Sequence, residues 1–461
     1  MGLTQDIGRF VAGIRFDRLP DGVVPIVATG FTDCVGVLLA GLSEPVTSIV
    51  SRANNISHDP RAIARFDGAA ASAPDLALLY GTAAHALDYD DTALSGHPSA
   101  VLVPAILAQA AEVDADGRGA DGRQMIAAYV AGYEVWAELI GRDQGQHHRK
   151  GWHPSAVFGT IAAAAAASVL RRLDADQATN AVALAASLAG GVGANFGTMT
   201  KPFQVGRAGQ SGLVAARLAA EGLTASADAL EHPLGFLAAF SPNGAVDRES
   251  AAPLGRTWRI LENGVNVKLY PMCYCTHRAA DAMIALRKAN NLEPENIRSV
   301  DVDLGDAQLA VLRNHRPQTG LEAKFSLEFA MASSATVGRC TRHELATEFV
   351  RRPEIQDFFA KVQAHPTTER AEDDPLFAPF DRVRVTLNDG RELASEPIRY
   401  PQGHFRRPVD RERLWEKFAD CAADVIRPVE ARQLFEALQD LPRLGSLRDL
   451  AASGDVAAAA R

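Results

Sequence analysis

The first 265 residues contain a series of long apolar segments with helical spacing and no strand-like segment between them. The segment 24–42 places apolar residues three or four positions apart, which is the spacing of one buried helical face. The segment 157–173 contains six consecutive alanines, and alanine is both the best helix former and small enough to let helices approach closely. Segments of similar length and spacing occur at 100–112, 125–140, 177–188 and 206–221. Consecutive helices without strands predict a helical bundle rather than a doubly wound sheet.

After Asn263 the sequence predicts strands as well as helices. Residues 297–304 alternate between apolar and polar, and residues 382–387 do the same before the turn at 388–390, Asn-Asp-Gly. Two segments between these strands are predicted to be helical: 323–337 and 341–350. Beyond Pro408, two amphipathic helices are predicted at 411–423 and 429–438. Their spacing alone does not assign them to either region of the chain.

The overall charge limits the kinds of partner that are expected. The chain has 47 Lys and Arg residues against 56 Asp and Glu residues, a formal net charge of −9. This balance argues against binding to nucleic acids or anionic membranes, because both require a basic surface. It does not exclude an anionic substrate, because a local group of Lys, His and Arg residues outweighs the mean charge.

Cysteine use and the absence of a targeting pattern indicate a reducing compartment. Five scattered cysteines are too few for a disulfide framework. Cys273 and Cys275 form a C-x-C pair without a second pair or matched histidines, so two ordinary thiols are expected rather than a metal centre. Residues 1–18 lack the apolar core of a signal peptide, and the longest apolar run, 157–170, is shorter than the roughly 18 residues of a membrane span. We expect a cytoplasmic protein that binds neither membrane nor nucleic acid.

The first dense group of polar residues is HALDYDDT at 85–92, inside an otherwise apolar helical stretch. On a helix, His85, Asp88 and Thr92 share one face, because they are three and four positions apart. Carboxylates and histidines at the end of a core helix are costly to bury unless they pair or serve a site. The alternative is that residues 90–92 are solvated capping residues.

His97, in the sequence GHPS at 96–99, follows this group. Pro98 ends any helix before it, so His97 is expected on a rigid loop. A histidine held near a carboxylate is the usual arrangement for proton transfer at neutral pH. The two sequences together therefore indicate an acid–base site.

Three of the twelve histidines lie in the sequence QHHRKGWH at 146–153. A metal site could use His147 and His153, but their spacing matches no common ligand pattern. A basic turn facing an anionic substrate and a solvated loop at 147–150 are equal alternatives. His153 stands out because it directly precedes the predicted helix 155–170, and the N-terminus of a helix favours a bound anion.

Lys201 lies in the sequence NFGTMTKP at 195–202, before a segment with glycines at 206, 209 and 212. These glycines lack the G-x-G spacing and the preceding strand of a dinucleotide-binding motif. Their spacing of three places them along one helical face, which suits close helix packing. We expect Lys201 on the loop before this helix, offering its ammonium group to a carboxylate. The alternative is a surface lysine.

The sequence VKLYPMCYCTH at 267–277 lies where the helical and mixed regions meet. Clefts between domains are favoured ligand sites, so Lys268, Tyr270 and His277 are candidate binding residues. The alternative is two packing residues and a solvated lysine. No nucleophile elbow, P-loop or zinc-protease motif stands out in the sequence. Histidines near carboxylates together with separated lysines suit proton transfer on a small polycarboxylate, with the lysines stabilising an enolate-like intermediate.

Seven motifs, in order between about residues 30 and 440, resemble those of the MmgE/PrpD family. They are HALDYDDT with GHPS, GYEV at 132–135, GWH at 151–153, GTMTKP at 197–202, KLYPMCYCTH at 268–277, AKFSLEF at 323–329 and YPQGHFRRP at 400–408. This family includes 2-methylcitrate dehydratase, cis-aconitate decarboxylase and iminodisuccinate epimerase. The resemblance covers nearly the whole chain.

The resemblance implies a mainly α protein with two domains. Residues 1–266 and 405–461 are expected to form a large all-helical domain, and residues 267–404 a smaller α+β lid domain. It also implies an active site in the cleft, a homodimer, and catalysis without a metal or another cofactor. By motif position, the active-site residues of the family fall on Asp88, Thr92, His97, His153, Lys201 and Lys268.

Two departures from the family pattern bear on the reaction. Decarboxylase-like members carry a tyrosine at the end of AKFSLEF, where this chain has Phe329. The proton-relay role of that tyrosine is therefore not carried over, which weakens the expectation of a cis-aconitate decarboxylase. The segment 197–202 differs from that of 2-methylcitrate dehydratases, which favours a divergent member.

These observations together predict a metal-independent lyase, of dehydratase or decarboxylase type, acting on a small di- or tricarboxylate. His97, oriented by Asp88, is expected to be the principal acid–base group. Catalytic roles are predicted for His97, Asp88 and His153, and substrate binding for Thr92, Lys201, Lys268, Tyr270 and His277. An epimerase or racemase of a dicarboxylate such as iminodisuccinate is the alternative, with His97 opposite His153 across the substrate. A non-catalytic carboxylate-binding protein is the third possibility, and in that case His97→Gln leaves its function intact.

Overall fold

The computed structural model describes residues 2–450 except 57–58, 118, 144–146, 373 and 448. The chain divides into two compact units. The first comprises Met1–Asn266 and Asp410–Arg461, and the second comprises Val267–Val409. The division expected from the sequence places its boundaries at 266/267 and 404/405.

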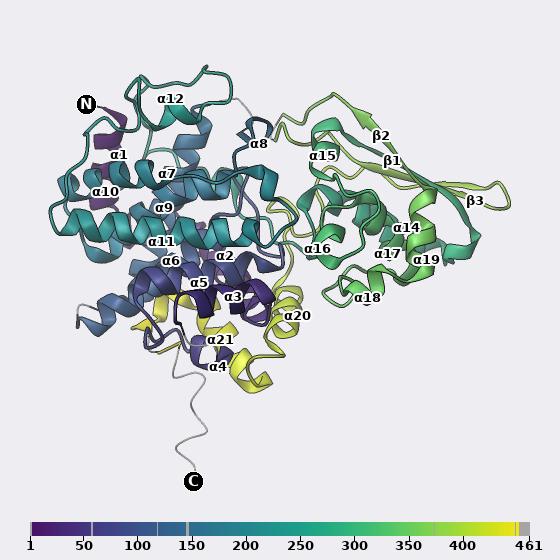
Figure 1. The fold of residues 1–461 in the computed structure, drawn as a ribbon, viewed down its shortest axis with the longest axis horizontal. Helices are drawn as coiled ribbons and strands as arrows, with labels where there is room; N and C mark the ends of the chain where they lie inside the picture. Colours follow the sequence, from purple (N-terminus) through teal and green to yellow (C-terminus); the bar gives the residue numbers. More distant parts are fainter. Residues whose placement is uncertain are drawn as a thin grey trace, which may run out of the picture. The chain divides into compact units, whose positions relative to one another are not determined.

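The first unit is built from helices (Figure 1). Its longer helices are α1 (Leu3–Gly13), α2 (Val23–Gly41), α3 (Pro45–Ala53), α5 (Ala73–Ala86), α6 (Pro98–Ala115), α7 (Gly122–Gly141), α9 (Pro154–Arg171), α10 (Ala175–Leu188), α11 (Thr200–Ala220), α20 (Arg411–Ala422) and α21 (Pro428–Gln439). Short helices and turns are α4 (Pro60–Ile63), α8 (His147–Lys150), α12 (Phe236–Phe240), α13 (Arg259–Asn263), η1 (Phe16–Arg18), η2 (Gly193–Asn195) and η6 (Leu441–Arg443). All six helices predicted between residues 24 and 221 are present, which confirms the mainly helical fold class.

Helix α9 lies in the core of the first unit. Only Val169 and Arg171 among its residues are not buried. Helices α6, α7, α10 and α11 all pack against it. The run of alanines leaves room for so many neighbours, because a methyl side chain keeps helix backbones close.

The glycines of α11 allow close helix contacts, as their spacing predicts. A Cβ atom on Gly206 would lie 2.1 Å from the carbonyl oxygen of Leu78 on α5. A Cβ atom on Gly212 would lie 2.5 Å from Cβ of Ala163 on α9. Gly209 is less constrained, with its nearest neighbour at 3.6 Å. Two of the three glycines therefore set the distance of α11 from α5 and α9, and so place the N-terminal turn of α11.

Helices α20 and α21 return to the first unit and pack on α2. A Cβ atom on Gly36 of α2 would lie 2.9 Å from the ring of Phe418 on α20, so a glycine is required at this contact. This packing assigns to the first unit the two helices that sequence spacing left unassigned.

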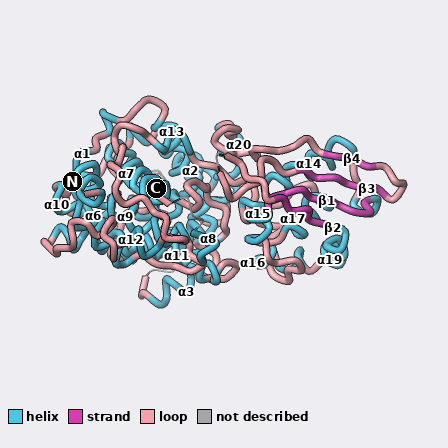
Figure 2. Tube along the Cα trace, turned by 90° about the horizontal axis from the view of Figure 1, so that it is seen from above, coloured by secondary structure: helices cyan, strands magenta, loops and turns pink. Residues whose placement is uncertain are grey.

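The second unit contains all the strands that the structure describes (Figure 2). The strands are β1 (Ile297–Gly305), β2 (Val362–Thr367), β3 (Arg382–Leu387) and β4 (Glu392–Ala394). The helices are α14 (His277–Asn290), α15 (Asp306–Val311), α16 (Gly320–Ala323), α17 (Leu327–Val337), α18 (Thr347–Val350) and α19 (Pro353–Phe358), with the turns η3 (Tyr274–Thr276), η4 (Pro294–Asn296) and η5 (Phe359–Lys361).

The four strands form one mixed sheet in the order β2-β1-β3-β4. Strand β1 pairs parallel with β2 and antiparallel with β3. Val300 lies opposite Val385 and Val302 opposite Val383, and all four side chains are fully buried. Helix α14 packs on β3 and on α17, so helices cover the apolar face of the sheet.

The helix predicted at 341–350 is wrong over its first half, because α18 covers only Thr347–Val350. The carboxylate of Glu344 accepts hydrogen bonds from the backbone N–H and the hydroxyl of Thr341, at 2.8 and 2.6 Å. Such local bonds compete with helix formation and close a turn instead.

The helix predicted at 323–337 is divided in two. Ser326 accepts a hydrogen bond from the N–H of Phe329 at 3.1 Å and caps a new helix that begins at Leu327. Strand β2 was not predicted from the sequence. Its side chains are half-buried or exposed and it contains Pro366, as is typical of an edge strand.

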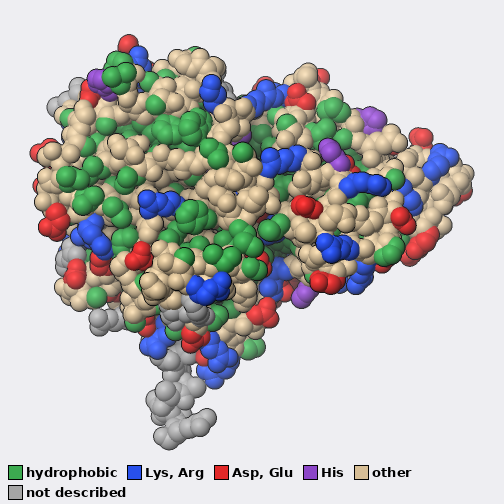
Figure 3. Space-filling model, viewed as in Figure 1, with side chains coloured by type: hydrophobic (Ala, Val, Ile, Leu, Met, Phe, Trp, Pro, Cys, Tyr) green, Lys and Arg blue, Asp and Glu red, His purple; other side chains and the backbone are tan. Residues whose placement is uncertain are grey.

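Within the described part of the chain, two helices are long and apolar enough to cross a membrane, namely α2 and α9. In this structure 78% and 89% of their apolar windows are buried. Core helices of a water-soluble protein have this property, so the length of these helices carries no further conclusion. Acidic and basic side chains are interspersed on the face shown in Figure 3.

Candidate active site

The chain leaves the helical conformation before the acidic residues of the HALDYDDT sequence. Helix α5 ends at Ala86, and Asp88 has a left-handed backbone with φ 51°. Thr92 pairs through its backbone with Asn266, at 3.0 and 2.9 Å. The prediction that His85, Asp88 and Thr92 share a helical face is therefore wrong, because a left-handed residue ends a right-handed helix.

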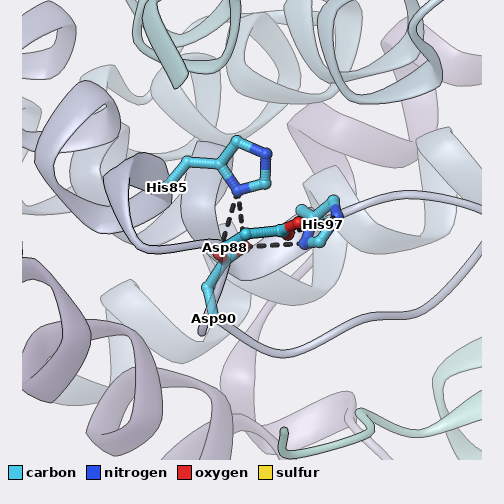
Figure 4. Close-up of side chains that lie close together, drawn as sticks. All are labelled: His85, Asp88, Asp90 and His97. Carbon is cyan, nitrogen blue, oxygen red and sulfur yellow. Dashed lines mark hydrogen bonds and ion pairs between the residues drawn. The ribbon is translucent and has the colours of Figure 1, made fainter. Parts of the chain in front are cut away.

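Asp90 joins two histidines (Figure 4). Its Oδ2 lies 2.8 Å from Nδ1 of His97, and its Oδ1 lies 2.9 Å from Nδ1 of His85. The predicted partner Asp88 is farther from His97, with Oδ1 3.8 Å from Nε2. Asp90 and Asp91 are fully buried, so the alternative that they are solvated capping residues is wrong.

Lys201 lies beside Asp88, with Nζ 3.0 Å from Oδ1. Lys201 is only 6% exposed, so the alternative of a surface lysine is wrong. Helix α11 begins at Thr200, which places Lys201 in the first helical turn rather than on the preceding loop as predicted. The ammonium group also lies 5.6 Å from the centre of the Phe196 ring. The site therefore contains a buried cation next to His97 and its carboxylates.

His153 immediately precedes α9 and is 1% exposed. Its Nδ1 lies 2.7 Å from Oε1 of Gln204, and its ring packs edge-on against Phe196 with centroids 4.9 Å apart. His147, the other half of the metal alternative, packs edge-on against Phe158 at 4.8 Å. Gln146, the first residue of the QHHRKGWH sequence, lies outside the described residues.

His85, His97 and His153 form one group, here called the histidine cluster. The ring centroids of His85 and His97 are 4.3 Å apart, and those of His85 and His153 are 6.1 Å apart. Sequence reasoning named His97 and His153 as site residues and treated His85 only as a neighbour. The structure brings all three together with Asp88, Asp90 and Lys201.

Burial determines the charges in this cluster. Desolvation lowers the pKa of His85 to about 3, although the Asp90 carboxylate opposes the shift. Desolvation and then the Lys201 charge hold the pKa of His153 well below its ordinary value. Desolvation alone would raise the pKa of Asp90, but His85 and His97 outweigh it and hold that pKa well below the usual range. At neutral pH Asp90 is therefore ionised, and His85 and His153 are neutral.

The hydrogen bond to Asp90 assigns the tautomer of His85. An ionised carboxylate only accepts hydrogen bonds, so Nδ1 of His85 carries the proton that faces Asp90 and Nε2 holds the lone pair of the neutral ring. Nδ1 of His97 lies within ion-pair distance of the same carboxylate, 2.8 Å from Oδ2. Nε2 of His85 and of His153 are buried without a hydrogen-bond partner among the described residues. Buried acceptors of this kind mark a place where a ligand or a water supplies a donor.

The cluster also has donor atoms with the spacing of a metal site. One atom each from His85, Asp88, Asp90 and His97 lie within 4.8 Å of one another. However, Lys201 Nζ already lies 3.0 Å from Asp88, Nδ1 of His85 is hydrogen-bonded to Asp90, and Nδ1 of His97 lies 2.8 Å from the same carboxylate. A protonated ring nitrogen does not bind a metal, and the ammonium group supplies the positive charge. The donor set therefore fits a proton-transfer site better than a metal centre.

Three predicted site residues belong to the second unit. Lys268 is 1% exposed, so the alternative of a solvated lysine is wrong. The hydroxyl of Tyr270 donates to Oδ1 of Asp281 at 2.6 Å. His277 is fully buried, with Nε2 3.3 Å from the carbonyl oxygen of Met272 and its ring 5.0 Å from that of Tyr270.

Phe329 occupies a packing position in the second unit. It lies on α17, is fully buried and contacts the ring of Phe349 with centroids 6.4 Å apart. The Phe329 side chain offers no proton.

A buried ion pair supports the loop that carries Asp88 and Asp90. The ammonium group of Lys417, on α20, contacts Oδ1 of Asp33 at 2.5 Å and donates to the carbonyl oxygen of Tyr89 at 2.8 Å. Both side chains are almost completely buried. Because Tyr89 stands between Asp88 and Asp90, this contact fixes the backbone of both.

Asp90 and Gln204 are the functional candidates that sequence reasoning missed. Asp90 lies in the motif already singled out, but the helix assumed there pointed to Asp88. Gln204 is three residues from Lys201 on α11, and so on the same helical face. That spacing is the signal that indicates it, once the helix is known to begin at Thr200.

Comparison with known proteins identifies relatives over nearly the whole chain. The profile of the MmgE/PrpD N-terminal domain matches residues 5–249, and that of the MmgE/PrpD C-terminal domain matches residues 270–441. Cis-aconitate decarboxylase of Mus musculus is 26% identical over 454 residues, which cover 96% of this chain and 91% of that protein. Cis-aconitate decarboxylase of Homo sapiens is 26% identical over 457 residues, covering 96% and 92%. The Aspergillus terreus enzyme of the same name is 26% identical over 475 residues, covering 97% and 95%.

Proposed function

The chain belongs to the MmgE/PrpD family, and we propose from this premise that it is a lyase acting on a small tricarboxylate such as cis-aconitate. The proposal carries over the reaction type of relatives that align with nearly all of the chain. The observation that supports it most is the contact of 2.8 Å between His97 and Asp90, beside the buried Lys201. The lyase reaction that we propose is either a decarboxylation or a dehydration.

The proposed decarboxylation needs a cation and a proton donor. When the bond to the leaving carboxylate breaks, carbon dioxide departs and the electron pair moves into the remaining conjugated carboxylate. Lys201 would stabilise that enolate-like charge. Protonated His97 would then give its Nε2 proton to carbon, and a water would restore it. Asp90 stabilises the imidazolium form that this step requires, as the carboxylate of a catalytic triad does.

An epimerase is the second candidate, because His97 and His153 both belong to the histidine cluster. A reaction of that kind needs acid–base groups on both faces of the substrate. The two histidines are unequal, however, since Nδ1 of His97 faces a carboxylate and Nδ1 of His153 faces an amide. This inequality favours a lyase. A non-catalytic binding protein is disfavoured by the ionised Asp90 held between two imidazoles, which suits proton transfer.

The remaining predicted properties are part of the proposal. Lys268, Tyr270 and His277 are proposed to bind substrate, Thr92 to hydrogen-bond it, and catalysis to need no metal or other cofactor. We propose a cytoplasmic homodimer that binds neither nucleic acid nor membrane. Four exposed apolar side chains between residues 188 and 203 support the dimer, namely Leu188, Val192, Met199 and Phe203.

Proton NMR in deuterated water tests the reaction. The purified protein is incubated separately with cis-aconitate, citrate, 2-methylcitrate and iminodisuccinate. A lyase changes the carbon skeleton or the vinyl signals of one of the first three. Exchange of an α-proton of iminodisuccinate without a change in its skeleton would instead identify an epimerase. No change with any of the four acids would contradict the proposed substrate class.

A further inference from the structure

Gln204 has one orientation available beside His153. Its Nε2 lies 3.2 Å from the carbonyl oxygen of Val192, and its Oε1 lies 2.7 Å from Nδ1 of His153. The amide nitrogen donates to the carbonyl, so the amide oxygen is the atom that faces the ring. Because that oxygen only accepts, Nδ1 of His153 must carry a proton and Nε2 the lone pair.

The segment around Val192, whose carbonyl oxygen accepts a hydrogen bond from Gln204, is also hydrogen-bonded to His153. The backbone N–H of His153 donates to the carbonyl oxygen of Gly191 at 3.0 Å, and Trp152 forms an antiparallel bridge with Val192. A Cβ atom on Gly191 would lie 3.2 Å from Oε1 of Gln204, so a larger residue would crowd the amide. The His153 ring and the Gln204 amide are therefore both held in place by contacts with the backbone of residues 152–153 and 191–192.

The charged and titratable groups around His153 come from three other parts of the chain. They are Lys201 on α11, His85 on α5 and His97 before α6. All three disfavour a positive charge on His153, and so does its burial, which together hold its pKa well below the ordinary value. The amide of Gln204 adds no negative charge to oppose them. Asp90 has the reverse effect on His97, because its carboxylate stabilises an imidazolium.

We propose that Gln204 is a positioning residue that fixes His153 as a neutral imidazole with its proton on Nδ1, so that His97 alone carries protons to the substrate. Nε2 of His153, a buried acceptor, then receives a hydrogen bond from a donor on the substrate side, namely a hydroxyl, a protonated carboxyl group or a bound water. The proton is therefore added to the substrate carbon from one face only, the face next to His97. This inference rests on the proposed lyase function and assigns different roles to His97 and His153 within that site.

Histidine ¹⁵N NMR of the substrate-free protein tests the tautomer directly, with the His153→Gln variant identifying the signal. We expect His153 to show one protonated nitrogen, Nδ1, from pH 5.5 to pH 8. In Gln204→Glu, which adds a carboxylate, both nitrogens should be protonated at the acidic end of this range. Gln210→Glu on the same helix is the matched control, because Gln210 bonds Arg207 and Asp75 instead of a histidine. It should leave the His153 signal unchanged.

Kinetics provide a second readout that a purely structural role would not move. Gln204→Leu should lower kcat about 10- to 100-fold with little change in KM, by analogy with the loss of a partner that orients a metal-bound histidine. Gln204→Glu should add a second ionisation to the pH profile of kcat. A His153 proton on Nε2, a His153 that titrates near its ordinary pKa, or an unaltered profile in Gln204→Glu would overturn the proposal. Absence of turnover in the wild type would instead contradict the proposed function, because the NMR result needs no substrate.

Discussion

Nδ1 of His97 lies 2.8 Å from Oδ2 of the buried, ionised Asp90. The same carboxylate lies 2.9 Å from Nδ1 of His85, so one negative charge orients two imidazoles. His85 stays neutral because burial lowers its pKa to about 3. The negative charge of Asp90 is therefore available to stabilise a proton on His97, which is what an acid–base group needs.

Replacing Asp90 with asparagine should strongly reduce turnover. Asparagine has nearly the same shape, but its amide removes the charge and can present a donor to Nδ1 of His97, which favours the wrong tautomer. We expect kcat to fall about 100- to 10,000-fold, the range for loss of acid–base catalysis. Steady-state kinetics with the substrate identified by NMR measure this change.

Asp88→Asn is the comparison for that variant, because Asp88 contacts Lys201 more closely than His97. Its loss should change KM more than the loss of Asp90 does, since it alters the cation that holds a substrate carboxylate. If Asp88→Asn removes turnover and Asp90→Asn does not, the roles assigned to the two carboxylates are reversed.

His85 should make the protein less stable in acid. Its ordinary pKa of about 6.5 applies to the unfolded chain, whereas the folded pKa is about 3. Between these values the unfolded state binds more protons, so the free energy of unfolding decreases as the pH falls, by at most about 1.4 kcal/mol per pH unit. His85→Gln should show a weaker decrease between pH 6.5 and pH 4.5 in denaturant titrations. His343→Gln, which changes an exposed histidine, should behave like the wild type.

Lys417→Met should destabilise the first unit. It leaves the carboxylate of Asp33 buried without its cation, and breaking a buried ion pair in this way costs about 3–5 kcal/mol. Urea unfolding measures this loss. The double variant Lys417→Met, Asp33→Asn removes both charges and should recover part of the stability. Arg413→Met, on the exposed face of the same helix, should have little effect. Equal losses in Arg413→Met and Lys417→Met would contradict the assignment.

Removing metals should not change the activity. The donor atoms of His85, Asp88, Asp90 and His97 lie close to one another, and Asp88 also contacts Lys201. Dialysis against EDTA should therefore leave kcat and KM unchanged, and elemental analysis of the active protein should find no stoichiometric metal ion. Loss of activity on chelation, restored by one divalent metal, would show that these four residues bind a metal.

Much of the helical unit is predictable because its signals are local. Alanine runs and apolar spacing are properties of short segments, and they located six of the longer helices between residues 24 and 221, although not α3 or α5. The mixed unit was less predictable. The edge strand β2 has few buried side chains, and the turn at Glu344 depends on one carboxylate that closes on Thr341.

The site was only partly predictable for a different reason. The residue types at positions 85–97 indicated acid–base chemistry, but the left-handed backbone of Asp88 decides which carboxylate reaches His97. Lys417 and Asp33 are 384 positions apart, and no local pattern indicates such a contact. Gln204 contacts a histidine 51 positions away, and only the packing of α11 brings the two together.

The central claim is that His97 transfers a proton to a small tricarboxylate during a lyase reaction. The most direct measurement is NMR of the product formed from cis-aconitate in deuterated water, by the wild type and by His97→Gln at equal concentration. We predict loss of carbon dioxide, a five-carbon dicarboxylate with a single deuterium on one carbon, and little or no product from His97→Gln. Equal product from both proteins would show that His97 does not transfer the proton.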